Sequence, residues 1–155
     1  MPQQENIEKK LVIFDLDNTL RDNKGSGHMI PSALGLSMDV AANWAPWQVY
    51  VNENSQPISY MMRIYTLMCV DPETEVWIVT SSSFGTKEWI TKHGYVQPDF
   101  INERSITDNE APFEYKKGIV DGMERTIDLW VDDCPKMCSL MRKEGVKVLQ
   151  VTHNH

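Results

Sequence analysis

Two aspartates one residue apart, Asp15 and Asp17, directly follow the apolar residues 11–14. This short apolar run predicts a buried β-strand that ends at the first acid. Side chains alternate across a strand, so the two carboxylates should lie on the same face. Two acids that share a face repel each other unless a cation lies between them or one of them keeps its proton. The pair therefore predicts a functional site at the end of this strand.

Two later strands are also predicted to end in polar side chains. The predicted strand 75–80 ends at Thr80 and is followed by three serines, and the predicted strand 127–131 is followed by Asp132 and Asp133. Taken one at a time, each of these groups fits an ordinary loop or helix cap. In a parallel sheet, however, ligands bind outside the carboxyl ends of the strands. Three polar strand ends that meet at that edge predict one site.

Helical periodicity fills the gaps between the apolar runs. Helices are predicted over residues 58–69, 86–93, 112–123 and 134–144, with a short extended piece at 99–101 and a last strand at 147–151. Alternating strands and helices predict an α/β fold, a three-layer Rossmann-like parallel sheet with helices on both faces. No linker or repeat interrupts the pattern, so we expect one domain over residues 1–155.

Two stretches follow no clear period. Residues 21–28 are polar and contain glycine, which is typical of an exposed loop or hairpin. Residues 31–54 are expected to form a short helix followed by an irregular loop. This second stretch carries Trp44, Trp47 and Tyr50, which either stack on a ligand at the entrance of a site or pack into the core.

The composition excludes several classes of protein. Hydrophobic residues make up 41% of the chain and no apolar run approaches the length of a membrane span, so disorder and a membrane-spanning role are both disfavoured. The three cysteines fit neither a disulfide framework nor a common zinc pattern. A formal net charge of −7 disfavours broad binding to nucleic acid, but it leaves room for a nucleotide held by a local patch and a divalent metal. We expect a soluble cytoplasmic protein with no membrane partner.

The sequence resembles the phosphatase branch of the haloacid dehalogenase-like (HAD) superfamily. Residues 14–20 match its first motif, a strand that ends in Asp-x-Asp-x-Thr, and residues 76–80 match its second, a strand that ends in Ser or Thr. Residues 129–133 match its fourth motif, and the lysine of its third motif is either Lys116 or Lys117. The resemblance implies a HAD-like fold. Only the short segment 21–75 separates the first two motifs, which implies a cap domain that is small or absent.

The resemblance implies a role for each matched residue. Asp15 would be the nucleophile that forms an aspartyl-phosphate, and Asp17 would act as the general acid and base. Thr80 would donate a hydrogen bond to a phosphoryl oxygen, and the lysine would neutralise negative charge. The implied cofactor is Mg²⁺, with these ligands: Asp15, Asp17 through its backbone carbonyl, Asp132 and Asp133. The implied substrate-binding residues are Asn18, Thr19, Ser81 and Arg104.

Within the superfamily, the chain is similar to the phosphatase domain of phage-type polynucleotide kinase-phosphatases. Arg104, an acid four residues later and Lys116 twelve residues later match the spacing in that subgroup, which favours Lys116 over Lys117 as the active-site lysine. The chain departs from the subgroup where Ser81 and Ser82 replace a Gly-Arg pair and where Pro112 replaces an aspartate. Serine does not replace an arginine that clamps phosphate, so the first departure speaks against a polynucleotide substrate.

We therefore expect a Mg²⁺-dependent phosphomonoester hydrolase that acts on a nucleotide or a nucleic-acid 3′-phosphate. Alternatives with the same residues are a 5′-nucleotidase or a phosphatase of small metabolites. A catalytically idle HAD-like module that binds a partner is less favoured, because an idle module has no need to keep both acidic pairs. The expected partners are a phosphorylated small molecule, a nucleotide or a nucleic-acid end, and an open site also permits an oligomer.

Overall fold

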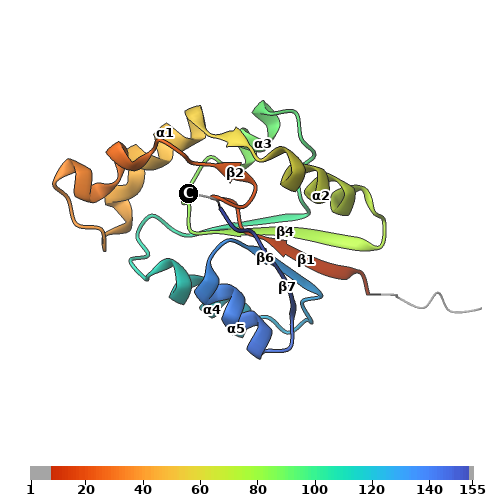
Figure 1. Ribbon diagram of the computed structural model, residues 1–155. Helices are drawn as coiled ribbons and strands as arrows, with labels where there is room; N and C mark the ends of the chain where they lie inside the picture. Colours follow the sequence, from red (N-terminus) through yellow and green to blue (C-terminus); the bar gives the residue numbers. More distant parts are fainter. Residues whose placement is uncertain (1–7, 154–155) are drawn as a thin grey trace, which may run out of the picture.

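The computed structural model describes residues 8–153, and a five-stranded parallel sheet forms its centre (Figure 1). The strand order is β5-β4-β1-β6-β7. The strands are β1 (Lys10–Phe14), β4 (Thr74–Thr80), β5 (Phe100–Glu103), β6 (Leu129–Asp132) and β7 (Lys147–Gln150). All neighbouring pairs are parallel, which confirms the predicted sheet.

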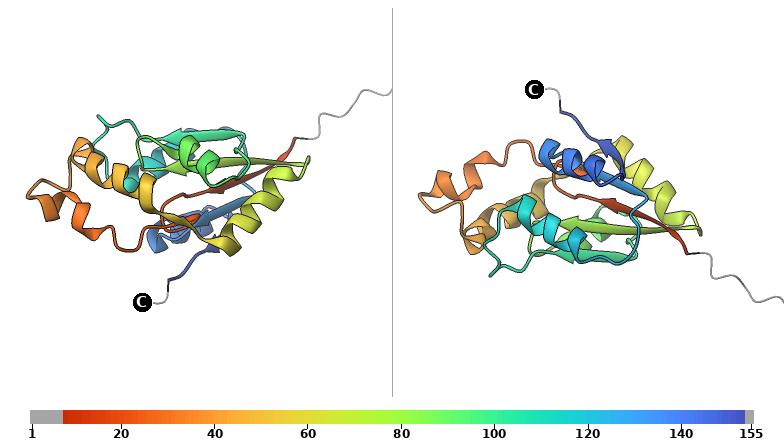
Figure 2. Two further views of the ribbon diagram at one scale, coloured as in Figure 1. Left: turned by 90° about the horizontal axis from the view of Figure 1, so that it is seen from above. Right: turned by 90° about the horizontal axis from the view of Figure 1, so that it is seen from below.

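Helices cover both faces of the sheet, as the alternating elements predicted (Figures 1 and 2). Helices α2 (Ser59–Val70) and α3 (Thr86–Lys92) lie on one face, and α4 (Pro112–Asp121) and α5 (Pro135–Lys143) lie on the other. The central strand serves both layers, because Val12 and Phe14 pack with α2 and α3 while Leu11 and Ile13 pack with α4 and α5. A strand buried on both faces explains the continuous apolar run.

The segment between β1 and α2 is the part that the sequence predicted least well. Residues 31–54 were expected to begin with a helix and end in a loop, but the order is reversed. Two 3₁₀ turns come first, Pro31–Leu34 and Ala41–Trp44, and a third, Gly27–Met29, lies just before this stretch. Helix α1 (Ala45–Asn54) follows them and extends beyond the carboxyl edge of the sheet. Short 3₁₀ turns repeat too few times to leave a periodic pattern in the sequence.

Residues 21–28 are only partly an exposed loop. Strand β2 (Arg21–Asp22) pairs antiparallel with β3 (Gln56–Pro57). This pairing joins the two ends of the long segment between β1 and α2. The expectation of exposure is wrong for Arg21, whose side chain is fully buried, and for Asn23 and Ser26, which are also buried. Polar side chains can be buried when they have hydrogen-bond partners, and Arg21 and Asn23 both bond to Asp17.

The register of the sheet places the polar strand ends side by side. Phe14 lies opposite Ile78 on β4 and opposite Val131 on β6, so Asp15 follows β1 at the level where β4 and β6 are about to end. The sheet therefore carries Asp15, Thr80 and Asp132 to one edge, as predicted.

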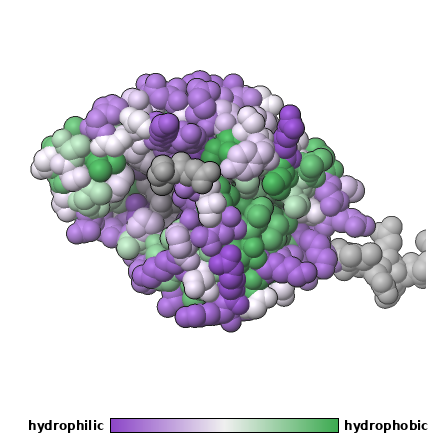
Figure 3. All heavy atoms as spheres, in the orientation of Figure 1, coloured by the Kyte–Doolittle hydropathy of each residue, from purple (hydrophilic) through white to green (hydrophobic). Residues whose placement is uncertain are grey.

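Some apolar side chains remain on the surface. The exposed ones include Tyr60, Leu67 and Val70 on α2 and Leu149 on β7. Figure 3 shows apolar side chains gathered on the face that it draws, over the region of α2 and β7. No helix among residues 8–153 is both long and apolar enough to cross a membrane.

Candidate active site

Asp15 lies at the centre of the site, buried at the end of β1. Its Oδ1 accepts a hydrogen bond from Lys116 Nζ at 2.8 Å, and its Oδ2 accepts one from Thr19 Oγ1 at 3.0 Å. Thr19 can reach back because the chain turns sharply at Asn18, which has a φ of 61°. Asparagine is one of the few residues that tolerate this left-handed conformation.

Lys116 reaches the site from the second turn of α4, a helix that begins at Pro112. Its Nζ lies between two acids, 2.8 Å from Asp15 Oδ1 and 3.2 Å from Asp132 Oδ2. Burial alone would lower the pKa of Lys116, but these two carboxylates raise it above the ordinary lysine value. Lys116 is therefore a fixed cation at this point, whereas Lys117 is exposed.

Asp15, Asp132 and Asp133 form a cluster in which one carboxylate oxygen of each residue lies within 4.8 Å of the others. Burial raises the pKa of Asp15 well above its usual value. The carboxylates of Asp132 and Asp133 raise it further, and the ammonium group of Lys116 lowers it. Burial also raises the pKa of Asp133. The ammonium group of Lys116 balances only part of the negative charge of three carboxylates. Carboxylate oxygens are also the ligands that Mg²⁺ prefers. The cluster therefore fits a divalent cation.

The two acids at the end of β6, Asp132 and Asp133, differ in how many hydrogen bonds they already accept. Asp132 is fully buried; it accepts bonds from Cys134 N at one oxygen and from Trp130 Nε1 and Lys116 at the other. Asp133 is half-buried, with Thr19 Oγ1 at 3.4 Å from one oxygen and His153 Nε2 at 3.8 Å from the other. Asp133 thus has more free lone pairs with which to bind a metal directly.

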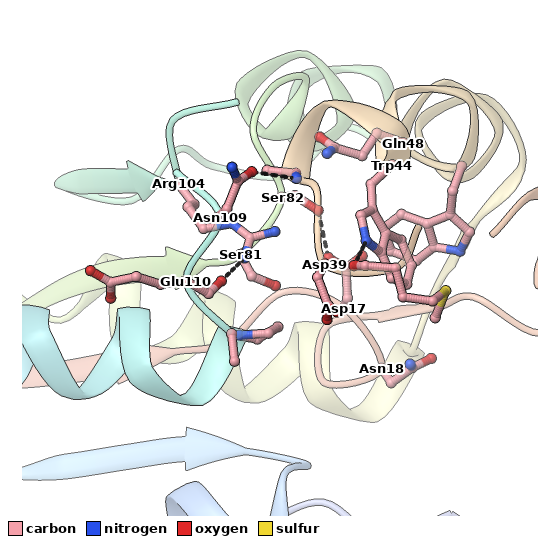
Figure 4. A pocket seen from close by; sticks show the side chains of 15 residues that line it. Asp17, Asn18, Asp39, Trp44, Gln48, Ser81, Ser82, Arg104, Asn109 and Glu110 are labelled. Atoms are coloured by element: carbon pink, nitrogen blue, oxygen red, sulfur yellow. Dashed lines mark hydrogen bonds between the residues drawn. The ribbon is translucent and has the colours of Figure 1, made fainter. Parts of the chain in front are cut away.

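Asp17 belongs to a separate network, next to a cavity that Figure 4 shows from close by. Its Oδ1 accepts bonds from Arg21 Nε at 2.7 Å and Asn23 Nδ2 at 2.8 Å, and its Oδ2 accepts one from Ser82 Oγ at 2.7 Å. Burial alone would raise the pKa of Asp17, but Arg21 and these donors hold it below its usual value. Because the carboxylate is occupied in this way, the backbone carbonyl is the part of Asp17 that remains for a metal.

The cavity beside Asp17 has a volume of about 240 Å³. The predicted residues Asn18, Ser81 and Arg104 line it together with Asp17. Further lining residues come from the segment before α1, from α1, from the loop after β4, and from the loop after β5 up to the start of α4: Met38, Asp39, Ala41, Trp44, Trp47, Gln48, Ser82, Asn109, Glu110, Ala111 and Pro112. The predicted substrate-binding residue Thr19 faces Asp15 instead.

Thr80 lies at the end of β4, fully buried. Its Oγ1 accepts a hydrogen bond from Ser82 N at 3.1 Å, so the chain bends at Ser81, and the Ser82 hydroxyl bonds to Asp17. Within the described part of the chain, no residue accepts the hydroxyl hydrogen of Thr80. Thr80 and Ser81 thus stand where a strand end can present donors to an incoming oxygen.

Arg104 follows β5 and is 6% exposed. One of its terminal nitrogens donates to the Glu110 carbonyl oxygen at 2.6 Å, and its Nε has no hydrogen-bond partner in the described structure. Among residues 8–153, no carboxylate lies close enough to Arg104 to form an ion pair. A buried arginine without a counterion makes this side of the cavity attractive to an anion.

Trp44 and Trp47 form the aromatic part of the cavity wall. Their rings meet edge to face, with the centroids 5.5 Å apart. The indole nitrogen of Trp44 donates to the Met38 carbonyl at 3.0 Å, and that of Trp47 donates to Ser26 Oγ at 3.0 Å. Neither ring packs into either of the two hydrophobic cores on the faces of the sheet. Tyr50 packs on His28 and does not line the cavity.

Sequence reasoning missed two residues near Asp17. Arg21 was assigned to an exposed loop, because its spacing of four residues from Asp17 indicates an ion pair only on a helix, and residues 17–21 form a turn. Asn52 of α1 had no signal, yet its Oδ1 accepts a bond from Arg21 at 2.8 Å. Ser82 stands where the similar subgroup has an arginine, and the guanidinium of Arg21, from another element, lies close to it, with Nη2 at 3.5 Å from Ser82 Oγ.

No protein-family model matches the chain, and no match to a curated protein is found. Solved structures do match. Two structures of the Pnkp1/Rnl/Hen1 RNA repair complex align with TM-scores of 0.67 and 0.69 at 15% and 16% identity, over 100% and 97% of this chain. This chain spans only 50% and 45% of those chains.

Two smaller proteins align over most of their own length. A haloacid dehalogenase-like hydrolase of Streptococcus pneumoniae has a TM-score of 0.57 at 14% identity, over 94% of this chain and 85% of that one. A HAD-family enzyme of Bacteroides thetaiotaomicron, in complex with magnesium and inorganic phosphate, has a TM-score of 0.58 at 12% identity, over 95% and 96%. The chain therefore has the fold of the haloacid dehalogenase-like hydrolases.

Proposed function

We propose that the chain is a Mg²⁺-dependent phosphomonoester hydrolase that works through an aspartyl-phosphate on Asp15. The observation that carries this proposal is the position of Asp15, a buried carboxylate held by Lys116 at 2.8 Å within a cluster of three acids. A second carboxylate, Asp17, lies on the cavity side of the same turn. A nucleophile beside a cation, with a separate acid-base group nearby, is the arrangement that phosphoryl transfer through a covalent intermediate needs.

In the first step, a carboxylate oxygen of Asp15 attacks phosphorus while the bond from phosphorus to the leaving oxygen breaks. Asp17 gives a proton to that oxygen. The low pKa of Asp17 leaves its carboxylate ionised in the free protein, so Asp17 must first take up this proton, which the monoanionic form of the phosphate ester can supply. In the second step, a water molecule transfers a proton to Asp17 and attacks phosphorus. The bond to Asp15 then breaks, and phosphate leaves.

The other residues of the site stabilise charge during these steps. Lys116 stays protonated and offsets negative charge on Asp15 and on the transferring group. Thr80 and Ser81 would donate hydrogen bonds to phosphoryl oxygens. Mg²⁺ at Asp15, Asp133, the Asp17 carbonyl and, behind them, Asp132 would supply positive charge for the phosphate oxygens.

The cavity beside Asp17 favours a nucleotide or a nucleic-acid 3′-phosphate as the substrate. Its wall combines two tryptophan rings, on which a planar base can stack, with Arg104, a cation that can hold a further phosphate. The likeness to the Pnkp1/Rnl/Hen1 RNA repair complex supports the same choice. A 5′-nucleotidase would use the same wall, whereas a phosphatase of small metabolites would leave it unused.

The first test is hydrolysis of 4-nitrophenyl phosphate by the purified protein. We expect turnover with Mg²⁺, no turnover with EDTA, and full recovery when Mg²⁺ is added in excess. Mg²⁺ should also raise the melting temperature, because a cation that binds only the folded acid cluster stabilises the fold. Absence of hydrolysis of every phosphomonoester in a broad panel, together with a rise in melting temperature, would leave the idle binding module as the better reading.

The second test separates nucleotides from small metabolites. We expect Trp47→Ala to raise KM for a nucleoside 3′-monophosphate about tenfold, since stacking of a base on an aromatic ring is worth roughly 1–3 kcal/mol. KM for glycerol phosphate should not change. Tyr60→Ala, on the exposed face of α2, is the matched control. If Trp47→Ala weakens both substrates equally, the cavity wall does not bind a base.

A further inference from the structure

Arg21 is a buried cation that the reaction outlined above does not use. Its side chain is fully buried and comes from the two-residue strand β2, beside the first acidic motif. Nε donates to Asp17 Oδ1 at 2.7 Å, Nη1 donates to Asn52 Oδ1 at 2.8 Å, and Nη2 lies 3.5 Å from Ser82 Oγ. The guanidinium carbon also lies 5.6 Å from the centre of the Trp89 ring.

This arrangement has little reason to exist for stability alone. Removing an arginine and a carboxylate from water costs about as much free energy as their attraction returns, so a buried pair is weak support for a fold. The guanidinium, moreover, is held on a prepared frame. Asn52 is fixed by a second bond, from its Nδ2 to the Phe84 carbonyl at 3.1 Å.

Gly85 shows how closely this frame is packed. A Cβ atom at Gly85 would lie 2.2 Å from Asn52 Nδ2, and the φ of Gly85 is +88°. Only glycine fits both the left-handed conformation and the close approach of Asn52. Helix α1 and the loop after β4 therefore hold the far end of Arg21, and Arg21 in turn holds Asp17.

The contacts of Asp17 distinguish its two carboxylate oxygens. Oδ1 faces two groups that can only donate, Arg21 Nε and Asn23 Nδ2, so a proton on Oδ1 would clash with both. Oδ2 faces the Ser82 hydroxyl at 2.7 Å, a group that can either donate or accept. Any proton that Asp17 carries therefore belongs on Oδ2.

We propose that Arg21 is a positioning residue: it fixes Oδ1 of Asp17 and so assigns to Oδ2 the proton transfer to the leaving oxygen. This inference rests on the proposed phosphatase function. Proton transfer from a carboxylic acid depends on which oxygen carries the proton and on where it points. Without Arg21, only Asn23 still donates to Oδ1, so the carboxylate is held less firmly and the proton is less strictly confined to Oδ2.

The test measures how Arg21→Gln changes kcat/KM for two substrates whose leaving groups differ in their need for a proton. An alkoxide needs a proton when it leaves, whereas 2,4-dinitrophenolate does not. We expect kcat/KM for the best alkyl phosphate of the panel to fall about tenfold to hundredfold, the range that misplacement of a catalytic group costs. For 2,4-dinitrophenyl phosphate we expect a change of less than about threefold. Arg21→Lys keeps a cation but not both hydrogen bonds, so it should fall between the wild type and Arg21→Gln.

Two further variants separate positioning from a loss of folding. Asn52→Ala removes the anchor of Arg21 and leaves both charges in place, and it should show the same dependence on the leaving group with a smaller loss. In an Asp17→Asn background, Arg21→Gln should cause no additional loss with the alkyl phosphate, because it acts through Asp17. Arg142→Gln, at an exposed arginine that contacts Gln150, is the matched control.

Each outcome decides the question. An equal fall for both substrates in Arg21→Gln and Asn52→Ala would mean that Arg21 only supports the fold, and the positioning role would be wrong. A gain with the alkyl phosphate would overturn it as well, since it would mean that Arg21 hinders proton transfer. If the wild type hydrolyses neither substrate, the proposed phosphatase function fails instead.

Discussion

The Asp15→Asn protein is expected to hydrolyse no phosphomonoester above the background rate. An amide nitrogen does not attack phosphorus as a carboxylate oxygen does, so no covalent intermediate can form. The measurement has two parts. Turnover of 4-nitrophenyl phosphate is followed with Mg²⁺, and the protein is quenched in acid during turnover and weighed by mass spectrometry. The wild type should carry a phosphoryl group on Asp15 that hydroxylamine removes, and the variant should carry none.

The fold of Asp15→Asn should survive, and its stability provides a second readout. Burial and the neighbouring acids raise the pKa of Asp15, so its ionised form costs stability at every pH above the ordinary aspartate value. Without a divalent cation at neutral pH, the neutral amide should therefore raise the melting temperature above that of the wild type. Mg²⁺ should then stabilise the variant less than it stabilises the wild type.

A matched control lies seven residues along the chain. Asp22 is exposed on β2, where its Oδ1 accepts a bond from Lys24 N at 2.9 Å. Asp22→Asn changes the same chemical group outside the acid cluster and should keep full turnover. If Asp15→Asn stays active, or if the phosphoryl group is found on another residue, Asp15 is not the nucleophile.

The elements that build the sheet could be predicted because their signals are local. Residues 11–14, 75–80 and 147–151 were predicted as strands, and β1, β4 and β7 agree with these limits to within one residue. Each is a short apolar run closed by polar residues or a glycine. Once the sheet is parallel, the convergence of Asp15, Thr80 and Asp132 follows from geometry alone, with no knowledge of the loops.

The surroundings of Asp17 could not be predicted, because they depend on contacts between distant segments. Arg21 looks like a loop residue by composition, and its burial depends on Asn52, 31 residues away, and on Ser82, 61 residues away. The helix expected within residues 31–54 was placed at the wrong end of that stretch for a related reason. It covers a cavity rather than the sheet, so Trp47 and Gln48 take the place of an apolar stripe.

Lys116→Ala is expected to lower turnover about a hundredfold or more, the cost of losing one donor that stabilises developing charge. The structural reason is that Lys116 is the one cation in contact with Asp15, at 2.8 Å, among residues 8–153. The loss should appear in kcat with both alkyl and aryl phosphates, because charge on the transferring group develops whatever the leaving group is. Arg21→Gln, by contrast, is expected to slow the hydrolysis of alkyl phosphates far more than that of 2,4-dinitrophenyl phosphate.

The variant should also be less stable until a metal is added. Removing one partner of a buried ion pair costs about 3–5 kcal/mol, because the remaining charge is left unpaired. Here Asp15 and Asp132 would face each other without Lys116, and Mg²⁺ at the same carboxylates should restore much of the loss. Chemical denaturation with Mg²⁺ and with EDTA measures both free energies of unfolding.

Lys117 is the matched control for this experiment, since it is the same residue type one position along α4 but exposed. Lys117→Ala should change turnover little and should leave the effect of Mg²⁺ on stability unaltered. The opposite ranking, with Lys117→Ala inactive and Lys116→Ala active, would assign the catalytic charge to the outer face of α4. It would then follow that the short contact between Lys116 and Asp15 does not serve the reaction.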